Sequence, residues 1–238
     1  MYLAIDTSTE EAGLSLSSVD GAVVYEKNWI SKRNHTAELH PEIEFSLVSN
    51  DLSPDDLQGI IVAIGPGTFT GVRIGMAAAK GLSLGLNIPI VGIGTLDIAA
   101  YPFSNMEQNI IAIIPAGRGE FACAIYEKKA SYSDPAIKLN KIKDDHLASF
   151  NEIQSYIELS EDPVLICGEI PQETETELQI SFGKKVIIPD SQERLRKARH
   201  LSYLGNNRIL LGDFDNAQTL LPVYIRPSAA EENFDRKS

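Results

Sequence analysis

The chain has 238 residues, of which 43% are hydrophobic and 23% are charged, and its formal net charge is −12. These values are ordinary for a globular protein and exclude the fibrous and intrinsically disordered classes. Because nucleic acids are bound largely through lysine and arginine contacts to phosphate, so acidic a chain is a poor candidate for binding RNA or DNA directly. An acidic surface suits a basic protein partner better.

Three observations favour a cytoplasmic protein without a membrane segment. Cys123 and Cys167 fit neither a zinc motif nor a disulfide framework, so we interpret them as small buried side chains in strands. The N-terminus has no basic segment and reaches Asp6 too early for a secretory signal. The apolar stretch at residues 74–93 is interrupted by Pro89 and several glycines, which indicates a packed helix and a strand.

Hydrophobic patterning predicts the elements of the first half. Short or alternating apolar runs predict five strands, at residues 2–5, 13–18, 22–29, 59–64 and 88–93. Two helices are predicted at residues 36–49 and 71–86. Pro41 must either start or kink the first of these helices. The sequence GPGTFTG at residues 65–71 joins the fourth strand to the second helix.

The second half repeats this order. Strands are predicted at residues 110–114, 121–126, 136–142, 164–167 and 185–188. Helices are predicted at residues 173–180 and over a segment that contains Leu147, Phe150, Ile153 and Ile157. Both halves therefore run strand, strand, strand, helix, strand, helix, strand. Their first hairpins match in length, so that Asp6 aligns with Pro115.

We therefore predict an α/β fold made of two halves, residues 1–104 and 105–190. Residues 191–226 are predicted to form a helical return, with a helix at residues 192–213, and a last segment that packs on the halves. The polar tail at residues 227–238 is expected to be disordered.

The turn GPGTFTG is the sharpest local signal. Gly65 and Gly67 permit positive φ angles and close approach of another backbone, and Thr68 or Thr70 can cap the helix that follows. Amide groups at such a helix start attract anions. The turn nevertheless lacks the Lys-Ser/Thr of a Walker motif and the glycine that a dinucleotide motif has at its sixth position. A structural elbow is at least as good an interpretation as a ligand loop.

The helix after this turn carries many small residues. Glycine inside a helix costs about 1 kcal/mol relative to alanine, so several glycines in one helix imply a compensating close contact. We expect that contact to be with another helix, and for the outer face we favour a helix of another chain. The candidate interface residues are Gly67, Thr68, Phe69, Arg73, Gly75, Met76, Ala78, Ala79, Leu39 and Ile43.

Two hairpin turns are weak candidates for nucleotide contact. Asp6, Thr7 and Ser8 could hold a metal-bound nucleotide, although their spacing alone favours a turn that merely closes a hairpin. In the matching turn of the second half, Gly117 and Arg118 could contact phosphate, or the arginine could pair with another chain. Pro115 occupies the place of a second acidic residue, so we expect catalysis between the halves to be impaired.

Neither a metal site nor a catalytic residue is predicted. His35 and His40 are five positions apart, which does not place them on one helix face for joint metal ligation. The other two histidines, His146 and His200, add no metal pattern. The spacing supports no Ser/His/Asp triad and no carboxylate pair.

Taken in order, these residues resemble the TsaB family. The resemblance rests on residues 3–9, on the eleven residues 65–75, on the turn at residues 118–120 and on the sequence PVYIR at residues 222–226, and it covers nearly the whole chain. It implies duplicated ribonuclease-H-like halves of the actin/Hsp70/sugar-kinase type. It also implies a role in the bacterial machinery that places threonylcarbamoyl on the tRNA adenosine beside the anticodon.

Within that machinery the resemblance implies a non-catalytic partner of the paralogue TsaD, with the ATPase TsaE as a third component. TsaD relatives carry two metal-binding histidines where this chain has Thr95 and Ala99, so the resemblance implies no metal here. TsaB-like proteins commonly have aspartate at the place of Pro115, which makes a nucleotide role of the second turn more doubtful.

The leading hypothesis is a scaffold subunit whose helices at residues 36–49 and 71–86 dock TsaD. Alone, the chain would form a homodimer, and it would meet tRNA only indirectly. It would need no cofactor of its own, with room for ATP or ADP at a subunit junction. The alternatives are an ATP-dependent phosphotransferase of the same fold that uses Asp6, and a metallopeptidase, which would require bound zinc or iron.

Overall fold

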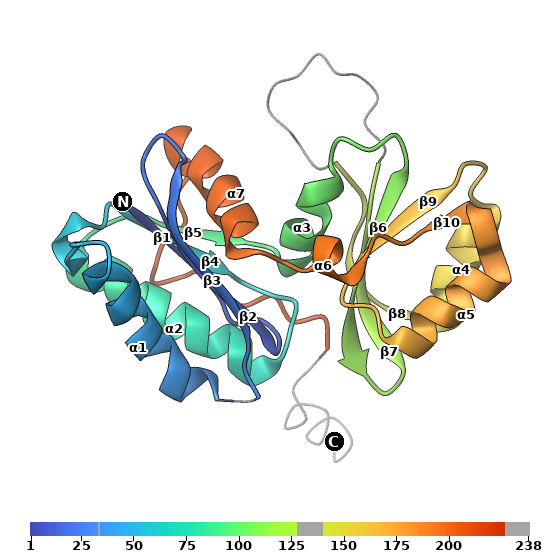
Figure 1. Ribbon diagram of the computed structural model, residues 1–238, viewed down its shortest axis with the longest axis horizontal. Helices are drawn as coiled ribbons and strands as arrows, with labels where there is room; N and C mark the ends of the chain where they lie inside the picture. Colours follow the sequence, from blue (N-terminus) through green and yellow to red (C-terminus); the bar gives the residue numbers. More distant parts are fainter. Residues whose placement is uncertain (33, 128–139, 227–238) are drawn as a thin grey trace. The chain divides into compact units, whose positions relative to one another are not determined.

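The structure, a computed structural model, describes residues 1–32, 34–127 and 140–226. It divides into two compact units: unit 1 comprises Met1–Ile98 and Arg196–Tyr224, and unit 2 comprises Ala99–Leu195 and Ile225–Ser238. Each unit is built on one five-stranded sheet (Figure 1). The predicted tail at residues 227–238 lies outside the described residues.

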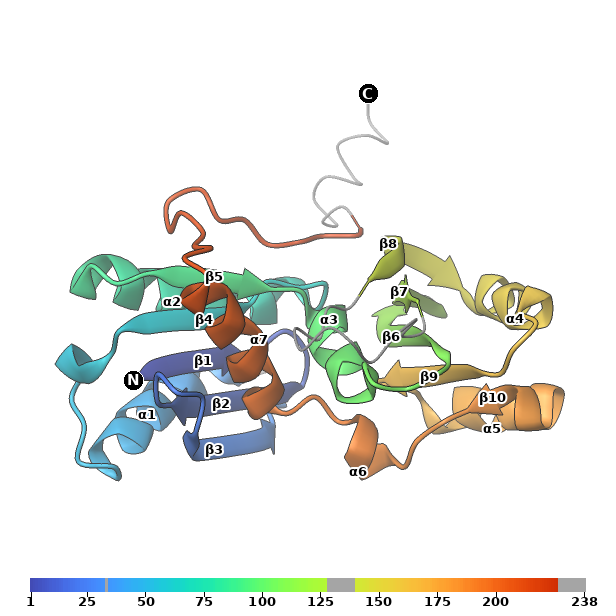
Figure 2. The same cartoon turned by 90° about the horizontal axis from the view of Figure 1, so that it is seen from above.

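Unit 1 carries a mixed sheet with the order β3-β2-β1-β4-β5. Its strands are β1 (Tyr2–Asp6), β2 (Glu11–Ser17), β3 (Val23–Ile30), β4 (Gly59–Ala63) and β5 (Ile90–Ile93). The first three form an antiparallel meander, and β4 and β5 run parallel to β1. The helices α1 (His35–Val48) and α2 (Phe69–Leu86) cover one face of this sheet, and α7 (Ala198–Leu210) covers the other (Figures 1 and 2).

The alternation of side chains along β1 explains why both faces are covered. Leu3 and Ile5 point into a core shared with α1 and α2, whereas Tyr2 and Ala4 point into a core shared with α7. A strand with apolar side chains on both faces would lose burial energy if either face were exposed to water. It therefore requires a helical layer on each side.

Unit 2 repeats the topology of unit 1. Its sheet has the order β10-β9-β6-β7-β8, so each unit follows the same 3-2-1-4-5 sequence of strands, and the predicted duplication is confirmed. The strands are β6 (Asn109–Gly117), β7 (Glu120–Tyr126), β8 (Lys141–Ser149), β9 (Val164–Gly168) and β10 (Val186–Ile187), and the helices in matching places are α4 (Phe150–Leu159) and α5 (Gln172–Phe182).

The remaining helical segments are short. They are α3 (Thr95–Ala100), α6 (Ser191–Arg194) and the single 3₁₀ turns η1 (Pro54–Asp56), η2 (Tyr101–Phe103) and η3 (Gly183–Lys185). None of the helices in the described ranges is long and apolar enough to cross a bilayer.

Two sequence predictions are wrong in detail. The strand expected at residues 136–142 begins outside the described residues, and within them β8 extends to Ser149, so Leu147 lies in a strand and not in the following helix. The helix begins at Phe150 because Ser149 and Glu152 form a capping box, in which the Ser149 N–H donates to the Glu152 carboxylate over 2.8 Å.

The helix predicted at residues 192–213 is also interrupted. Helix α6 ends at Arg194 and α7 begins at Ala198, while Lys197 between them has an extended backbone with φ −110° and ψ 139°. The side chain of Arg196, in the same break, makes a buried contact with β1.

One glycine in α7 is closely packed, whereas one in α2 has open space around it. A Cβ at Gly205 of α7 would lie 2.2 Å from Cγ2 of Ile61 in β4. Because glycine has no Cβ, α7 can pack closely on the sheet at this position. A Cβ at Gly81 of α2 would meet nothing within 4 Å.

We predict that the same substitution changes stability in opposite directions at these two positions. Gly205→Ala should lower the free energy of unfolding by about 1–3 kcal/mol through overpacking. Gly81→Ala should raise it by about 0.5–1 kcal/mol, because alanine favours the helix and no neighbour is displaced. Urea unfolding followed by circular dichroism measures both changes. Equal effects at the two positions would contradict this account of the packing.

The two cysteines are buried in β7 and β9, as expected from the sequence. Burial raises the pKa of the Cys123 thiol to about 12 and also raises that of Cys167. Because the thiolate is the reactive form, we predict that neither cysteine reacts with an aromatic disulfide reagent at pH 8 until the protein is unfolded in urea. Fast labelling of the folded chain would show that one of these strands opens readily.

Candidate functional site

The turn after β1 and the GPGTFTG turn form one cluster in unit 1. The Thr68 N–H donates to the Ser8 carbonyl oxygen over 2.7 Å. In return, the Thr7 hydroxyl donates to the Gly71 carbonyl oxygen over 2.7 Å. The two motifs that stand out in the sequence are therefore bonded to each other, although some sixty residues separate them.

Three glycines at four-residue intervals make this contact sterically allowed. A Cβ at Gly67 would lie 2.1 Å from the Ser8 carbonyl oxygen, and one at Gly71 would lie 2.2 Å from that of Thr7. At Gly75 it would lie 2.4 Å from the Thr7 hydroxyl. These glycines face a turn of their own chain, so the expectation that they approach another helix is wrong. A bulky residue at Gly75 would disturb the fold as well as any interface.

The rest of the GPGTFTG turn serves as an elbow. Thr68 caps α2, as expected, by accepting the Gly71 N–H over 3.2 Å. Gly65 has a φ of +101°, and a Cβ there would lie 2.7 Å from the carbonyl oxygen of Val223. The Val223 N–H donates to Ile64 over 2.8 Å, so the segment PVYIR lies against the entry to the turn. The turn therefore joins three segments that are distant in the sequence.

Asp6 is buried and already neutralised within unit 1. Its carboxylate accepts the Ser8 N–H over 2.9 Å and the Ser8 hydroxyl over 2.5 Å. It also pairs with the buried guanidinium of Arg196, whose Nε lies 3.1 Å from Oδ2. Arg196 extends the network, because its Nη2 donates to the Thr9 hydroxyl over 2.7 Å.

This arrangement limits what Asp6 can do chemically. A carboxylate that holds a metal-bound nucleotide must be reachable and must not already be paired with a fixed cation. The side chains of Asp6, Thr7 and Ser8 are all buried here, and an arginine occupies the place next to the carboxylate where a cation would bind. Arg196 was not predicted as a site residue, because a single arginine in a predicted helix carries no signal that it reaches the first strand.

The matching turn of unit 2 is open. Gly117, Arg118 and Gly119 have φ angles of 77°, 58° and 76°, and all three residues are exposed. The neighbouring Glu120 pairs with Arg226, the last residue of PVYIR. Pro115 lies exposed in β6. Gly117 and Arg118 thus lie at a solvent-facing hairpin, and a nucleotide contact there stays a prediction.

The structure places no metal-binding cluster of three or more His, Cys, Asp or Glu side chains within residues 1–32, 34–127 and 140–226. Thr95, at the start of α3, is buried, and its N–H donates to the Gly65 carbonyl oxygen over 2.8 Å. It thus helps to hold the start of the GPGTFTG turn, just after β4, in place.

The predicted interface residues separate into two groups. Leu39, Ile43, Met76 and Ala79 lie in the hydrophobic core between the sheet and the two helices, so their side chains cannot meet a partner. They were chosen for helical periodicity, which marks the buried face of an amphipathic helix. The residues at the start of α2 are different, because Gly67, Thr68, Phe69 and Arg73 are exposed, and Ala78 is half-buried.

The outer surfaces of the two helices carry exposed apolar residues that were not predicted from the sequence. Phe45 is 59% exposed, Val48 66% and Leu84 55%, and the exposed small residues Ala77 and Gly81 lie on α2. Helices α1 and α2 contact each other on the same face of the sheet (Figures 1 and 2). We call these five residues the α1–α2 face. Large apolar residues exposed together on neighbouring helices are typical of a protein interface.

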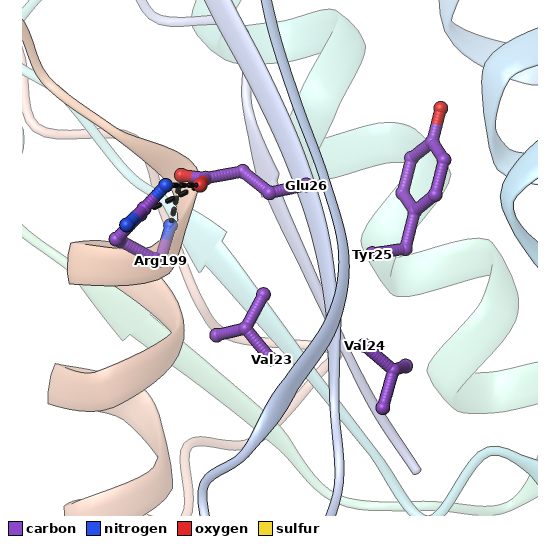
Figure 3. Close-up of a pocket in the computed structure, with 5 residues that line it drawn as sticks. All are labelled: Val23, Val24, Tyr25, Glu26 and Arg199. Carbon is purple, nitrogen blue, oxygen red and sulfur yellow. Dashed lines mark hydrogen bonds and ion pairs between the residues drawn. The ribbon is translucent and has the colours of Figure 1, made fainter.

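A small hollow also lies beside β3. It is lined by Val23, Val24, Tyr25, Glu26 and Arg199 (Figure 3). The Arg199 Nε donates to the Glu26 carboxylate over 2.6 Å, and the Tyr25 hydroxyl points away from that pair and donates to Glu42. Because these polar groups satisfy one another, we assign no ligand to the hollow.

The sequence is similar to proteins of one biosynthetic system. Residues 29–233 match the family described as "TsaD: tRNA N6-adenosine threonylcarbamoyltransferase". The chain is 29% identical to "tRNA threonylcarbamoyladenosine biosynthesis protein TsaB" of Bacillus subtilis, over 96% of this chain and 95% of that protein. It is 28% identical to the protein of the same name from Haemophilus influenzae, over 94% and 92% of the two chains.

Solved structures show the same fold. A Pseudomonas aeruginosa protein described as similar to the peptidase YEAZ superposes with a TM-score of 0.76 at 23% identity, over 94% of this chain and 99% of that one. The ethanolamine utilization protein EutJ from Carboxydothermus hydrogenoformans gives a TM-score of 0.50 at 14% identity, over 84% and 89%. The duplicated fold of the actin/Hsp70/sugar-kinase type, expected from the sequence, is confirmed.

We predict that Arg196→Met lowers the free energy of unfolding by about 3–5 kcal/mol, because it leaves the buried Asp6 carboxylate without its cation. The double variant Asp6→Asn, Arg196→Met should be less damaging than the single one, since the unpaired charge is then gone. Lys197→Met, at the partly exposed neighbouring position, is the control and should change stability by less than about 1 kcal/mol. Urea denaturation compares the three. An Arg196→Met variant as stable as the control would show that the pair contributes nothing.

Proposed function

Because this chain belongs to the TsaB proteins, within the family described as "TsaD: tRNA N6-adenosine threonylcarbamoyltransferase", we propose that it acts in tRNA threonylcarbamoyladenosine biosynthesis as a non-catalytic subunit that binds the TsaD-type transferase. The observation that carries the proposal is the α1–α2 face. There, unit 1 exposes large apolar side chains and small residues on two adjacent helices.

The composition of this face suits a helical partner. Alanine and glycine at positions 77 and 81 allow another helix axis to come near, because the distance between packed helices depends on the side chains at the contact. Phe45, Val48 and Leu84 then supply apolar area to bury. Interface binding energy concentrates in a few residues buried at the centre of the contact, a role that these large side chains could fill.

The pairing of Asp6 at the turn after β1 supports a non-catalytic role. Asp6 is internal and paired with Arg196, and the matching position of unit 2 holds Pro115 in place of an acidic residue. A kinase-like reaction would need reachable carboxylates for its metal-bound nucleotide. The chain's contribution to the reaction is then to stabilise the active conformation of its partner.

The remaining parts of the proposal concern the assembly. With a net charge of −12, the chain contacts tRNA only through its partners, and it works in the cytoplasm where the tRNA is. The ATPase TsaE joins as a third component, and without TsaD the α1–α2 face pairs with a second copy of this chain. No cofactor is assigned to the chain itself, and any ATP or ADP is placed at a subunit junction.

The test of the proposal is reconstitution of tRNA modification from purified components, with and without this chain. Product formation should require the chain, and the chain alone should not hydrolyse ATP. Full activity in its absence would refute the scaffold role. ATP turnover by the chain alone would favour the phosphotransferase alternative.

We predict that Phe45→Asp and Leu84→Asp each weaken binding to the TsaD-type partner by about 100-fold, because each places a charge in an apolar interface. Leu159→Asp is the matched control. Leu159 is 84% exposed on α4 of unit 2, so its replacement should leave the dissociation constant unchanged. Titration calorimetry measures all three. Equal losses for the three variants, or none, would place the docking surface elsewhere.

A further inference from the structure

Arg73 is held in a fixed pose on the surface of unit 1. Its guanidinium carbon lies 3.5 Å from the centroid of the Phe69 ring, and its Nε donates to the Tyr224 hydroxyl oxygen over 2.6 Å. The two rings stack with centroids 5.2 Å apart and an interplanar angle of 28°. Tyr224 belongs to PVYIR, so a segment from the far end of the sequence helps to orient a residue of α2.

Fixing this side chain has an energetic consequence. A free arginine on a helix surface samples many rotamers, and a partner that immobilises it loses binding free energy. Here the stacking and the hydrogen bond restrict the rotamers before any partner arrives. The aromatic side chains nevertheless stay accessible, with Phe69 41% exposed and Tyr224 40%.

The pose leaves one edge of the guanidinium available. Among the described residues, the hydrogen bond of Arg73 is made through Nε, and Nη1 and Nη2 are not used. These two groups form a planar fork whose spacing matches the two oxygens of a carboxylate.

The charges around this position favour a carboxylate from a protein. Arg73 and Lys80 are the charged residues of α2, which contains no Asp or Glu, although the whole chain carries a net charge of −12. Arg73 also lies four residues before Ala77, so it continues the line of exposed residues on the α1–α2 face. A helix docked on that face would pass beside the guanidinium.

We propose that Arg73 is a preorganised anchor for an Asp or Glu side chain of the docked protein, and that this pair fixes the position of the partner along α2. The inference rests on the proposed function, because it requires a partner on the α1–α2 face. It adds the polar contact that gives an otherwise apolar face its specificity.

The first experiment compares four variants by titration calorimetry against the TsaD-type partner. Arg73→Gln should raise the dissociation constant about tenfold or more, and Arg73→Lys nearly as much, since an ammonium group lacks the planar fork. Tyr224→Phe should raise it about threefold by freeing the guanidinium. Lys80→Gln removes the same charge from the same helix and should stay within about twofold.

These outcomes separate the inference from the proposed function. Wild-type affinity of Arg73→Lys would overturn the anchor, because charge alone would then suffice. Loss of binding in Phe45→Asp and Leu84→Asp, with unchanged binding in the Arg73 variants, would overturn the anchor and leave the docking surface intact. Absence of binding by the wild-type chain would refute the proposed function itself.

A second experiment identifies the anion. Arg73→Glu should abolish binding, and reversal of one Asp or Glu of the partner to Arg should restore it. If no such reversal restores binding, the carboxylate assignment is wrong. Inorganic phosphate and ADP are titrated into the chain alone as well. Binding of either one that is lost in Arg73→Gln would show that the fork recognises phosphate, and would overturn the proposal.

Discussion

The structure of unit 1 depends on one backbone contact, the seating of the GPGTFTG turn against the turn that follows β1. Because the two segments touch, Gly67 in the turn and Gly71 and Gly75 in α2, which face Thr7 and Ser8, have no room for a Cβ. This contact fixes the direction of α2 as it leaves the sheet. The outward residues of the helix, and Arg73 among them, take their places from it. A motif that looks like a phosphate loop thus serves to aim a helix.

An internal ion pair is the second constraint on unit 1. Asp6 lies at the end of β1, and Arg196 of the same unit pairs with its carboxylate. The result is a turn whose charges are balanced without any bound ligand. The proposed docking surface, the α1–α2 face, lies on helices whose inner sides pack the core.

Much of the fold was predictable, because strands buried on both faces leave unbroken apolar runs and the two halves repeat the same order. The capping box at Ser149 was also readable, although the apolar spacing around Leu147 suggested a longer helix. The site was harder. Periodicity identifies Leu39 and Met76, which are internal, whereas Phe45 and Leu84 stand out only once the helix orientation is known. No local pattern reveals that Arg196 reaches Asp6, since their pairing is a product of topology.

The two ends of unit 1 in the sequence are joined by that same pair, whose members are 190 positions apart. The larger segment of unit 2, Ala99–Leu195, is encoded between them. During synthesis on the ribosome, β1 to β5 therefore emerge long before α7, which must cover the second face of their sheet. Until then Tyr2, Ala4 and Ile61 lack their cover. The sheet that begins first is therefore covered late, and a chain truncated before Arg196 would leave an apolar sheet face open to aggregation.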